Sequence, residues 1–177
     1  MRKLFIIFIF LLTLKGAHSI ESWVPAGNMS AANTDWVYTM SANNTGNLFA
    51  SSWAVGVYKG NAAGNTSWNF SGLSGKRISD LFVAPNGDVY GYSHTTSTAY
   101  IHRSTDNGAS WQDVYVRAFA NNYAGGGGMV FPADSSIVAA FSVTVGPTIG
   151  DVSTFIFKST DGGNNWVQKA IIGAGFV

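Results

Sequence analysis

Two nearly identical nonapeptides, "RSTDNGASW" at 103–111 and "KSTDGGNNW" at 158–166, are the most informative feature of the sequence. They begin 55 residues apart, and each has the spacing Ser-x-Asp-x-Gly-x-x-Trp. A motif that occurs twice in a short chain is either a catalytic motif used twice or a structural device used once in each repeat. Its residue types and the segments around it favour the structural device.

The residue types of the motif suit a tight hairpin turn. Asp accepts hydrogen bonds from backbone N–H groups two or three residues further on, and Ser adds a second side-chain bond. Gly adopts a positive φ that a residue with a Cβ resists, and Trp buries a large ring against the sheet that follows. We therefore predict structural, turn-forming roles for two sets of residues: Ser104, Asp106, Gly108 and Trp111, and Ser159, Asp161, Gly163 and Trp166.

The segments that precede the two motifs are also alike. Each has an apolar strand, a Pro, a polar turn, a second apolar strand, a variable loop and a third strand. A third, less regular copy occupies 36–68, so that Trp68, Trp111 and Trp166 close three successive units. Repeats of this length with about four strands each are typical of propeller blades. In the middle unit we expect strands at 78–83, 88–93, 99–104 and 111–117.

The motif resembles the Asp-box, or BNR repeat, of sialidase-like β-propellers. Both nonapeptides match the box at all four fixed positions, whereas the copy around Gly64 and Trp68 lacks the Asp and is one residue longer. The resemblance implies an all-β fold, a β-propeller of four-stranded antiparallel blades at about 35–75, 76–120 and 121–177. It also implies that the boxes lie on outer turns of the blades, away from any active site.

Three blades are fewer than the roughly 4–8 blades of closed propellers. We therefore expect the propeller to be incomplete, as the N-terminal part of a larger one. Open blade faces and strand edges would then favour self-association. A strained ring of three blades, closed by an N-terminal strand around Trp23, is the alternative.

Residues 1–19 have the features of a secretory signal peptide. Two basic residues precede an apolar run at 4–14, and Ala17 and Ser19 are the small residues that a signal peptidase recognises. The run is shorter than the roughly 20 residues of a spanning helix, although an uncleaved membrane anchor is the alternative. We expect a mature chain at 20–177 that is secreted, periplasmic or at the cell surface, with no membrane span.

Composition and charge exclude several classes of partner. Three of the ten Lys and Arg residues lie in the expected signal peptide, which leaves seven against nine Asp and Glu. Such a charge-poor chain lacks the clustered positive charge that binding to nucleic acid requires. The absence of cysteine excludes disulfides and thiolate sites. We expect no cofactor and no metal site, because His94 and His102 have no third ligand in the pattern, and His102 is expected to pack between blades.

The resemblance does not select an activity, because the family includes sialidases, other glycosidases and sorting receptors. Sialidases of the family have an Arg-Ile-Pro motif and a Tyr nucleophile with a Glu partner. Here 77–79 reads Arg-Ile-Ser, and Glu21, beside the signal peptide, is the only Glu. Asp80 is a weak catalytic candidate because it could face a central channel, and a solvated carboxylate at a strand edge is the alternative. Asp88 follows Asn-Gly and is expected in a turn.

The sequence thus favours a module that binds a glycan or a protein ligand over an enzyme. The alternative is part of a sialidase-like or other glycoside hydrolase, whose catalytic residues are missing or lie in further blades. "GGGGM" at 125–129 lacks the Lys and Ser/Thr of a phosphate-binding loop and is expected to be a flexible loop before an inner strand.

Overall fold

The computed structural model describes residues 37–52, 55–61, 65–119, 123–144 and 152–173. The signal peptide expected at 1–19 and the strand expected around Trp23 lie outside these residues. Within them, all regular elements are strands, and no helix is long and apolar enough to cross a membrane.

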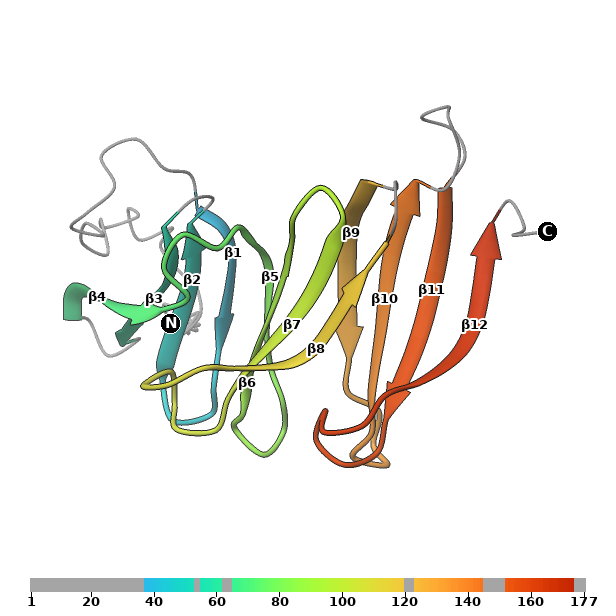
Figure 1. Ribbon diagram of the computed structural model, residues 1–177. Helices are drawn as coiled ribbons and strands as arrows, with labels where there is room; N and C mark the ends of the chain where they lie inside the picture. The colour runs from blue at the N-terminus through green and yellow to red at the C-terminus, as the bar shows by residue number, and fades with distance from the viewer. Residues whose placement is uncertain (1–36, 53–54, 62–64, 120–122, 145–151, 174–177) are drawn as a thin grey trace, which may run out of the picture.

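Twelve strands form three four-stranded antiparallel sheets, which lie side by side in chain order (Figure 1). The first sheet contains β1 (Val37–Ala42), β2 (Asn47–Ser52), β3 (Gly56–Asn61) and β4 (Asn65–Gly72). The second contains β5 (Ile78–Val83), β6 (Val89–His94), β7 (Thr98–Ser104) and β8 (Gln112–Ala118). The third contains β9 (Tyr123–Val130), β10 (Ile137–Thr144), β11 (Val152–Ser159) and β12 (Val167–Gly173). Each sheet is a meander in which every strand pairs with the next one in sequence.

The sheets meet mainly through their first strands. β1 packs against β5, and both β5 and β6 pack against β9. Between the first and second sheets the buried contact is small and mainly aliphatic, with the buried ring of Phe49 and the partly buried ring of Trp111. The inner strands are therefore the places where neighbouring sheets approach one another most closely.

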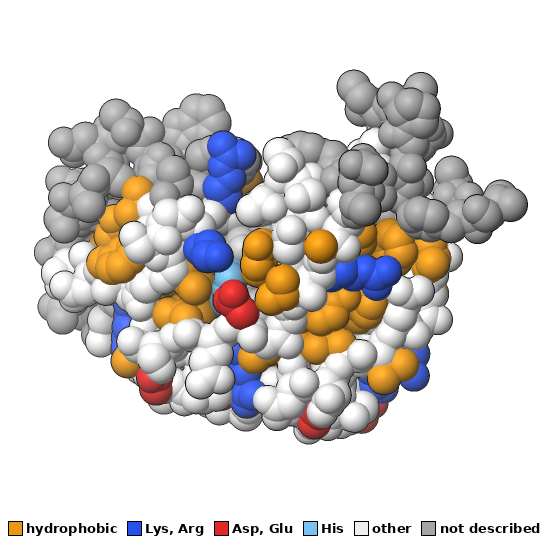
Figure 2. Space-filling model, in the orientation of Figure 1, with side chains coloured by type: hydrophobic (Ala, Val, Ile, Leu, Met, Phe, Trp, Pro, Cys, Tyr) orange, Lys and Arg blue, Asp and Glu red, His pale blue; other side chains and the backbone are white. Residues whose placement is uncertain are grey.

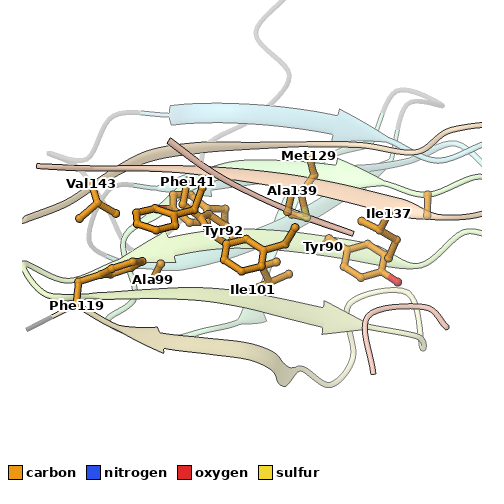
Figure 3. Close-up of a cluster of buried hydrophobic side chains, with 13 residues drawn as sticks. Tyr90, Tyr92, Ala99, Ile101, Phe119, Met129, Ile137, Ala139, Phe141 and Val143 are labelled. Carbon is orange, nitrogen blue, oxygen red and sulfur yellow. The ribbon is translucent and has the colours of Figure 1, made fainter. Parts of the chain in front are cut away.

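The main core lies between the second and third sheets and is aromatic (Figure 3). Tyr92 of β6 stacks on Phe141 of β10, with ring centroids 5.2 Å apart and planes at 15°. Tyr115 of β8 lies over the same Phe141 ring at 5.4 Å and over Phe157 at 5.1 Å. Each such pair contributes about 0.5–1.5 kcal/mol beyond the area it buries. Aromatic stacking thus holds these two sheets face to face.

The glycine-rich segment at 125–129 is part of strand β9, so the expectation of a flexible loop was wrong. Gly127 pairs with Phe141 on β10. A Cβ on Gly127 would lie 2.9 Å from Cζ of Tyr92, and the Tyr92 hydroxyl donates a hydrogen bond to the carbonyl of Gly125 over 2.5 Å. The glycines permit a close approach between a strand and the ring of the neighbouring sheet.

In the middle sheet, the strands that the sequence predicts agree with the observed ones to within one residue at each end. Trp111, expected as the first residue of its strand, and Trp166 directly precede β8 and β12. Trp68 differs, because it lies inside β4 and packs over Gly60. Gly64, in the irregular copy of the motif, lies outside the described residues.

Candidate functional site

Two hairpins, between β7 and β8 and between β11 and β12, contain the nonapeptides. In each, the Ser hydroxyl donates to the Asp carboxylate over 2.8 Å and accepts from the Gly N–H over 2.8 Å. The hydroxyl and N–H of Ser110 hold the pKa of Asp106 at about 2, and the N–H and side-chain amide of Asn165 hold that of Asp161 at about 2. Both carboxylates are thus engaged in local hydrogen bonds.

Each of these turns also lies against the preceding sheet. The Ser71 hydroxyl at the end of β4 donates to the carbonyl of Gly108 over 2.6 Å, and the Trp111 indole N–H donates to the carbonyl of Ser71 over 3.1 Å. In the next turn, the Tyr90 hydroxyl of β6 donates to the carbonyl of Gly162 over 3.0 Å. The turns therefore form contacts between blades as well as closing their own hairpins.

A pocket of about 420 Å³ lies at the other end of the second sheet. Its walls are the connection from β4 to β5, the end of β6, the hairpin that follows it, and Tyr100 of β7. Because β7 runs from this hairpin to the first Ser-Asp turn, pocket and turn lie at opposite ends of the strand. The lining consists of Gly75, Lys76, Arg77, Ser93, His94, Thr95, Thr96 and Tyr100.

The pocket lining has two basic side chains and several hydroxyl groups, and it has no carboxylate. Lys76 Nζ lies 4.6 Å from the centroid of the Tyr100 ring, so the cation is held over an aromatic wall. Such a lining is suited to a polyhydroxylated ligand, and its positive charge favours an anionic one. Sequence reasoning missed this site because its residues come from two loops and two strands.

A buried polar network lies directly beside the pocket. His102 of β7 is fully buried and joins two polar partners of its own sheet. The expectation that it packs between blades stays a prediction. Its Nε2 lies 2.7 Å from the Ser93 hydroxyl, and its Nδ1 lies 2.5 Å from the Asp113 carboxylate. Burial lowers the pKa of His102, although the bond to Asp113 opposes this effect. In Figure 2, basic, His and acidic side chains lie next to one another near the middle of the viewed face.

The structure does not bring Asp80 into the pocket. Asp80 lies on β5, where it accepts hydrogen bonds from the Thr39 hydroxyl of β1 over 3.2 Å and from the Leu81 N–H over 3.0 Å. Burial raises the pKa of Asp80, and the two hydrogen bonds limit that rise. The side chain is thus held between the first strands of two sheets, and its catalytic role stays a prediction.

Asp88 precedes β6 in the hairpin from β5. Its carboxylate accepts hydrogen bonds from Arg103 Nε and Nη2 over 2.9 and 2.6 Å, and its N–H donates to the Asn86 side chain over 3.1 Å. Among the residues with a described placement, no group of three or more His, Cys, Asp or Glu could hold a metal ion.

No family model and no curated protein matches this chain. Solved structures do match it. The α-L-arabinofuranosidase Arb93A of Fusarium graminearum, in complex with an iminosugar inhibitor, has a TM-score of 0.54 at 12% identity over 76% of this chain and 46% of that one. The α-L-arabinanase of Penicillium chrysogenum, complexed with arabinobiose, has a TM-score of 0.51 at 14% identity over 78% and 48%.

Sqt1 of Saccharomyces cerevisiae is also similar, with a TM-score of 0.55 at 14% identity over 80% of this chain and 36% of that one. The chain thus spans less than half the length of each of these proteins. At such low identity the similarity shows the fold alone. The fold is therefore that of an all-β β-propeller, with three four-stranded antiparallel blades in the described part of the chain.

Proposed function

We propose that this chain is a secreted propeller module of the BNR/Asp-box type that binds a glycan in the pocket beside Lys76. The pocket is the observation that carries the proposal. It is concave, it has hydroxyl groups from four residues, one of which is the aromatic Tyr100, and it lies at the blade end opposite the two Ser-Asp turns. The two complete motifs and their closed hydrogen-bond patterns support the BNR/Asp-box assignment.

The pocket chemistry favours an acidic glycan, one with carboxylate or sulfate groups. Lys76 and Arg77 both line it, and carboxylates are absent from its lining. The structurally similar arabinanase was solved with arabinobiose, and the arabinofuranosidase with an iminosugar, which supports a sugar ligand for a propeller of this kind.

Titration calorimetry of the purified chain with neutral and acidic oligosaccharides tests the proposal. We expect acidic oligosaccharides to bind, with an affinity that falls as the salt concentration rises. Lys76→Gln should weaken binding at least about five-fold, which corresponds to about 1 kcal/mol. Lys169→Gln removes an equal charge from β12, far along the chain from the pocket, and should leave the affinity unchanged.

Failure of every acidic oligosaccharide to bind would contradict the proposal, as would an equal loss of affinity in both variants. If a protein binds instead, through the same Lys76-dependent site, the role as a binding module would be supported and the glycan ligand would be rejected.

A second candidate function is glycoside hydrolysis that uses Asp80. The raised pKa of this half-buried carboxyl group favours it, because a general acid must retain its proton. Assays with a panel of fluorogenic glycosides test it. Turnover that Asp80→Asn abolishes and Asp134→Asn leaves intact would support an enzyme, and turnover that survives Asp80→Asn would reject this role.

A further inference from the structure

Ser93, His102 and Asp113 form a continuous chain of hydrogen bonds across three adjacent strands. Ser93 lies near the end of β6, His102 in the middle of β7, and Asp113 near the start of β8. The atoms that meet are Ser93 Oγ, both ring nitrogens of His102, and Oδ1 of Asp113, with separations of 2.7 and 2.5 Å. Rigid strands, rather than loops, thus hold all three groups.

The direction of the hydrogen bonds follows from the partners. An ionised carboxylate only accepts, so Nδ1 of His102 is the donor to Asp113. In the neutral ring the other nitrogen, Nε2, then carries the lone pair and accepts the hydroxyl proton of Ser93. This is the tautomer that a general base for a serine hydroxyl requires.

The surroundings keep His102 neutral and fixed. The ring is fully buried and lies parallel to Tyr100, with centroids 5.9 Å apart and an interplanar angle of 8°. The charged groups that face it are Asp113, which raises its pKa, and Lys76, which lowers it along with burial. A neutral imidazole at pH 7 is ready to accept a proton.

Ser93 lies in the wall of the pocket. It is one of the residues that line the pocket, with 2% of its surface exposed, so that a molecule bound there meets the network at Ser93. At the other end Asp113 is open to solvent, with 43% of its side chain exposed. Lys76 and Arg77 line the same pocket, and their charge can stabilise negative charge that develops on a bound carbonyl oxygen.

We propose that Ser93 is a nucleophile for carboxylic esters bound in the pocket, with His102 as its general base and Asp113 as a positioning residue. Ser93 Oγ bonds to the carbonyl carbon while its proton moves to His102 Nε2. The ester C–O bond then breaks, and the leaving alcohol takes that proton. Water gives a proton to the same nitrogen and attacks the acyl carbon. The bond to Ser93 Oγ then breaks, Ser93 regains its proton, and the acid is released.

Labelling of the wild-type chain with a fluorophosphonate probe tests the nucleophile without a variant that could misfold. We expect the probe to be covalently attached to Ser93, as located by peptide mass spectrometry. The probe contains no sugar, so a failure to label is independent of a failure to bind glycans. No attachment to the folded chain at pH 7–8 would overturn the proposal and leave the network with a structural role only.

Hydrolysis of p-nitrophenyl acetate measures the reaction itself. Ser93→Ala and His102→Gln should each lower kcat by roughly 10³-fold or more, since members of such a triad act as a unit. Asp113→Asn should lower kcat with little change in KM, because Asp113 acts through His102. Ser142→Ala, which removes a hydroxyl bonded to Thr154 on the third sheet, should keep full activity. Hydrolysis that persists in Ser93→Ala would overturn the proposal.

Discussion

At the scale of single residues, some side chains extend from one sheet to the next and hold the two together. The ring of Tyr90 lies in the aromatic core, 5.5 Å from that of Phe131, while its hydroxyl reaches the carbonyl of Gly162. Desolvation of this buried side chain raises the pKa of Tyr90 to about 12, so its hydroxyl stays a donor at all ordinary pH values. One residue thus contributes both apolar burial and a directed bond between blades.

Replacing Tyr90 with Phe should lower the free energy of unfolding by about 1 kcal/mol, because the ring stays and only the bond to Gly162 is lost. Urea denaturation of both chains measures the difference. An unchanged urea midpoint would show that the contact between turn and sheet contributes nothing to stability.

Acid should destabilise the fold by protonating the two turn carboxylates. Asp106 and Asp161 have pKa values of about 2 in the folded chain, below the ordinary value of 3.8 for an Asp side chain. A pKa that is lower when folded stabilises the protein above about pH 4, and that contribution is lost as the pH falls from 4 towards 2. Thermal unfolding followed from pH 6 to 2 checks this. The double variant Asp106→Asn, Asp161→Asn should lose less stability over pH 4–2 than the wild type does.

At the scale of strands and turns, the sequence predicts well what local chemistry decides. Ser, Asp and Gly at fixed spacing determine a hairpin by themselves, so the strands around the first nonapeptide could be located to within a residue. The hydrogen bonds from His102 to Ser93 and Asp113 could not be predicted from the sequence. They depend on the register between strands and on a bulge between Ile101 and His102. The four glycines were misread because their role depends on Tyr92, more than thirty residues away.

The strand β9 offers a direct test of that role. Gly127→Ala should destabilise the fold by about 1–3 kcal/mol, because its Cβ would crowd Tyr92 and the carbonyl of Ala140, each 2.9 Å away. Gly126→Ala is the matched control, since no atom lies within 4 Å of its Cβ and its substitution should be neutral or slightly stabilising. Equal effects of the two changes on the unfolding midpoint would contradict the packing role.

At the scale of the whole molecule, exposed apolar side chains lie on the outer faces of the first and third sheets. Pairing places Val130, Val138 and Val167 on the face of the third sheet that points away from Phe141. Val130 is 60% exposed and Val167 is 56% exposed. The first sheet has Met40 and Phe70 on its outer face, 53% and 51% exposed. Exposed apolar side chains of this kind favour association.

We therefore expect the purified chain to self-associate through these faces in a concentration-dependent manner. Val130→Lys together with Val167→Lys should shift the equilibrium towards monomer, because two charges would be buried in the contact. Analytical ultracentrifugation of the wild-type and variant chains measures this. A wild-type chain that is monomeric at all concentrations would contradict the expectation.

Each Ser-Asp turn contacts the sheet before it, and this direction of contact matches the order in which the chain is synthesised. Gly108 bonds to Ser71, and Gly162 bonds to Tyr90, so both docking partners were synthesised earlier than the turn that binds them. Translation supplies the chain from the N-terminus at about 5–20 residues per second. Each blade therefore docks on a blade that precedes it in the sequence, and its last hairpin can bind as soon as that hairpin emerges. The docking of each of these turns therefore does not depend on residues that are synthesised later.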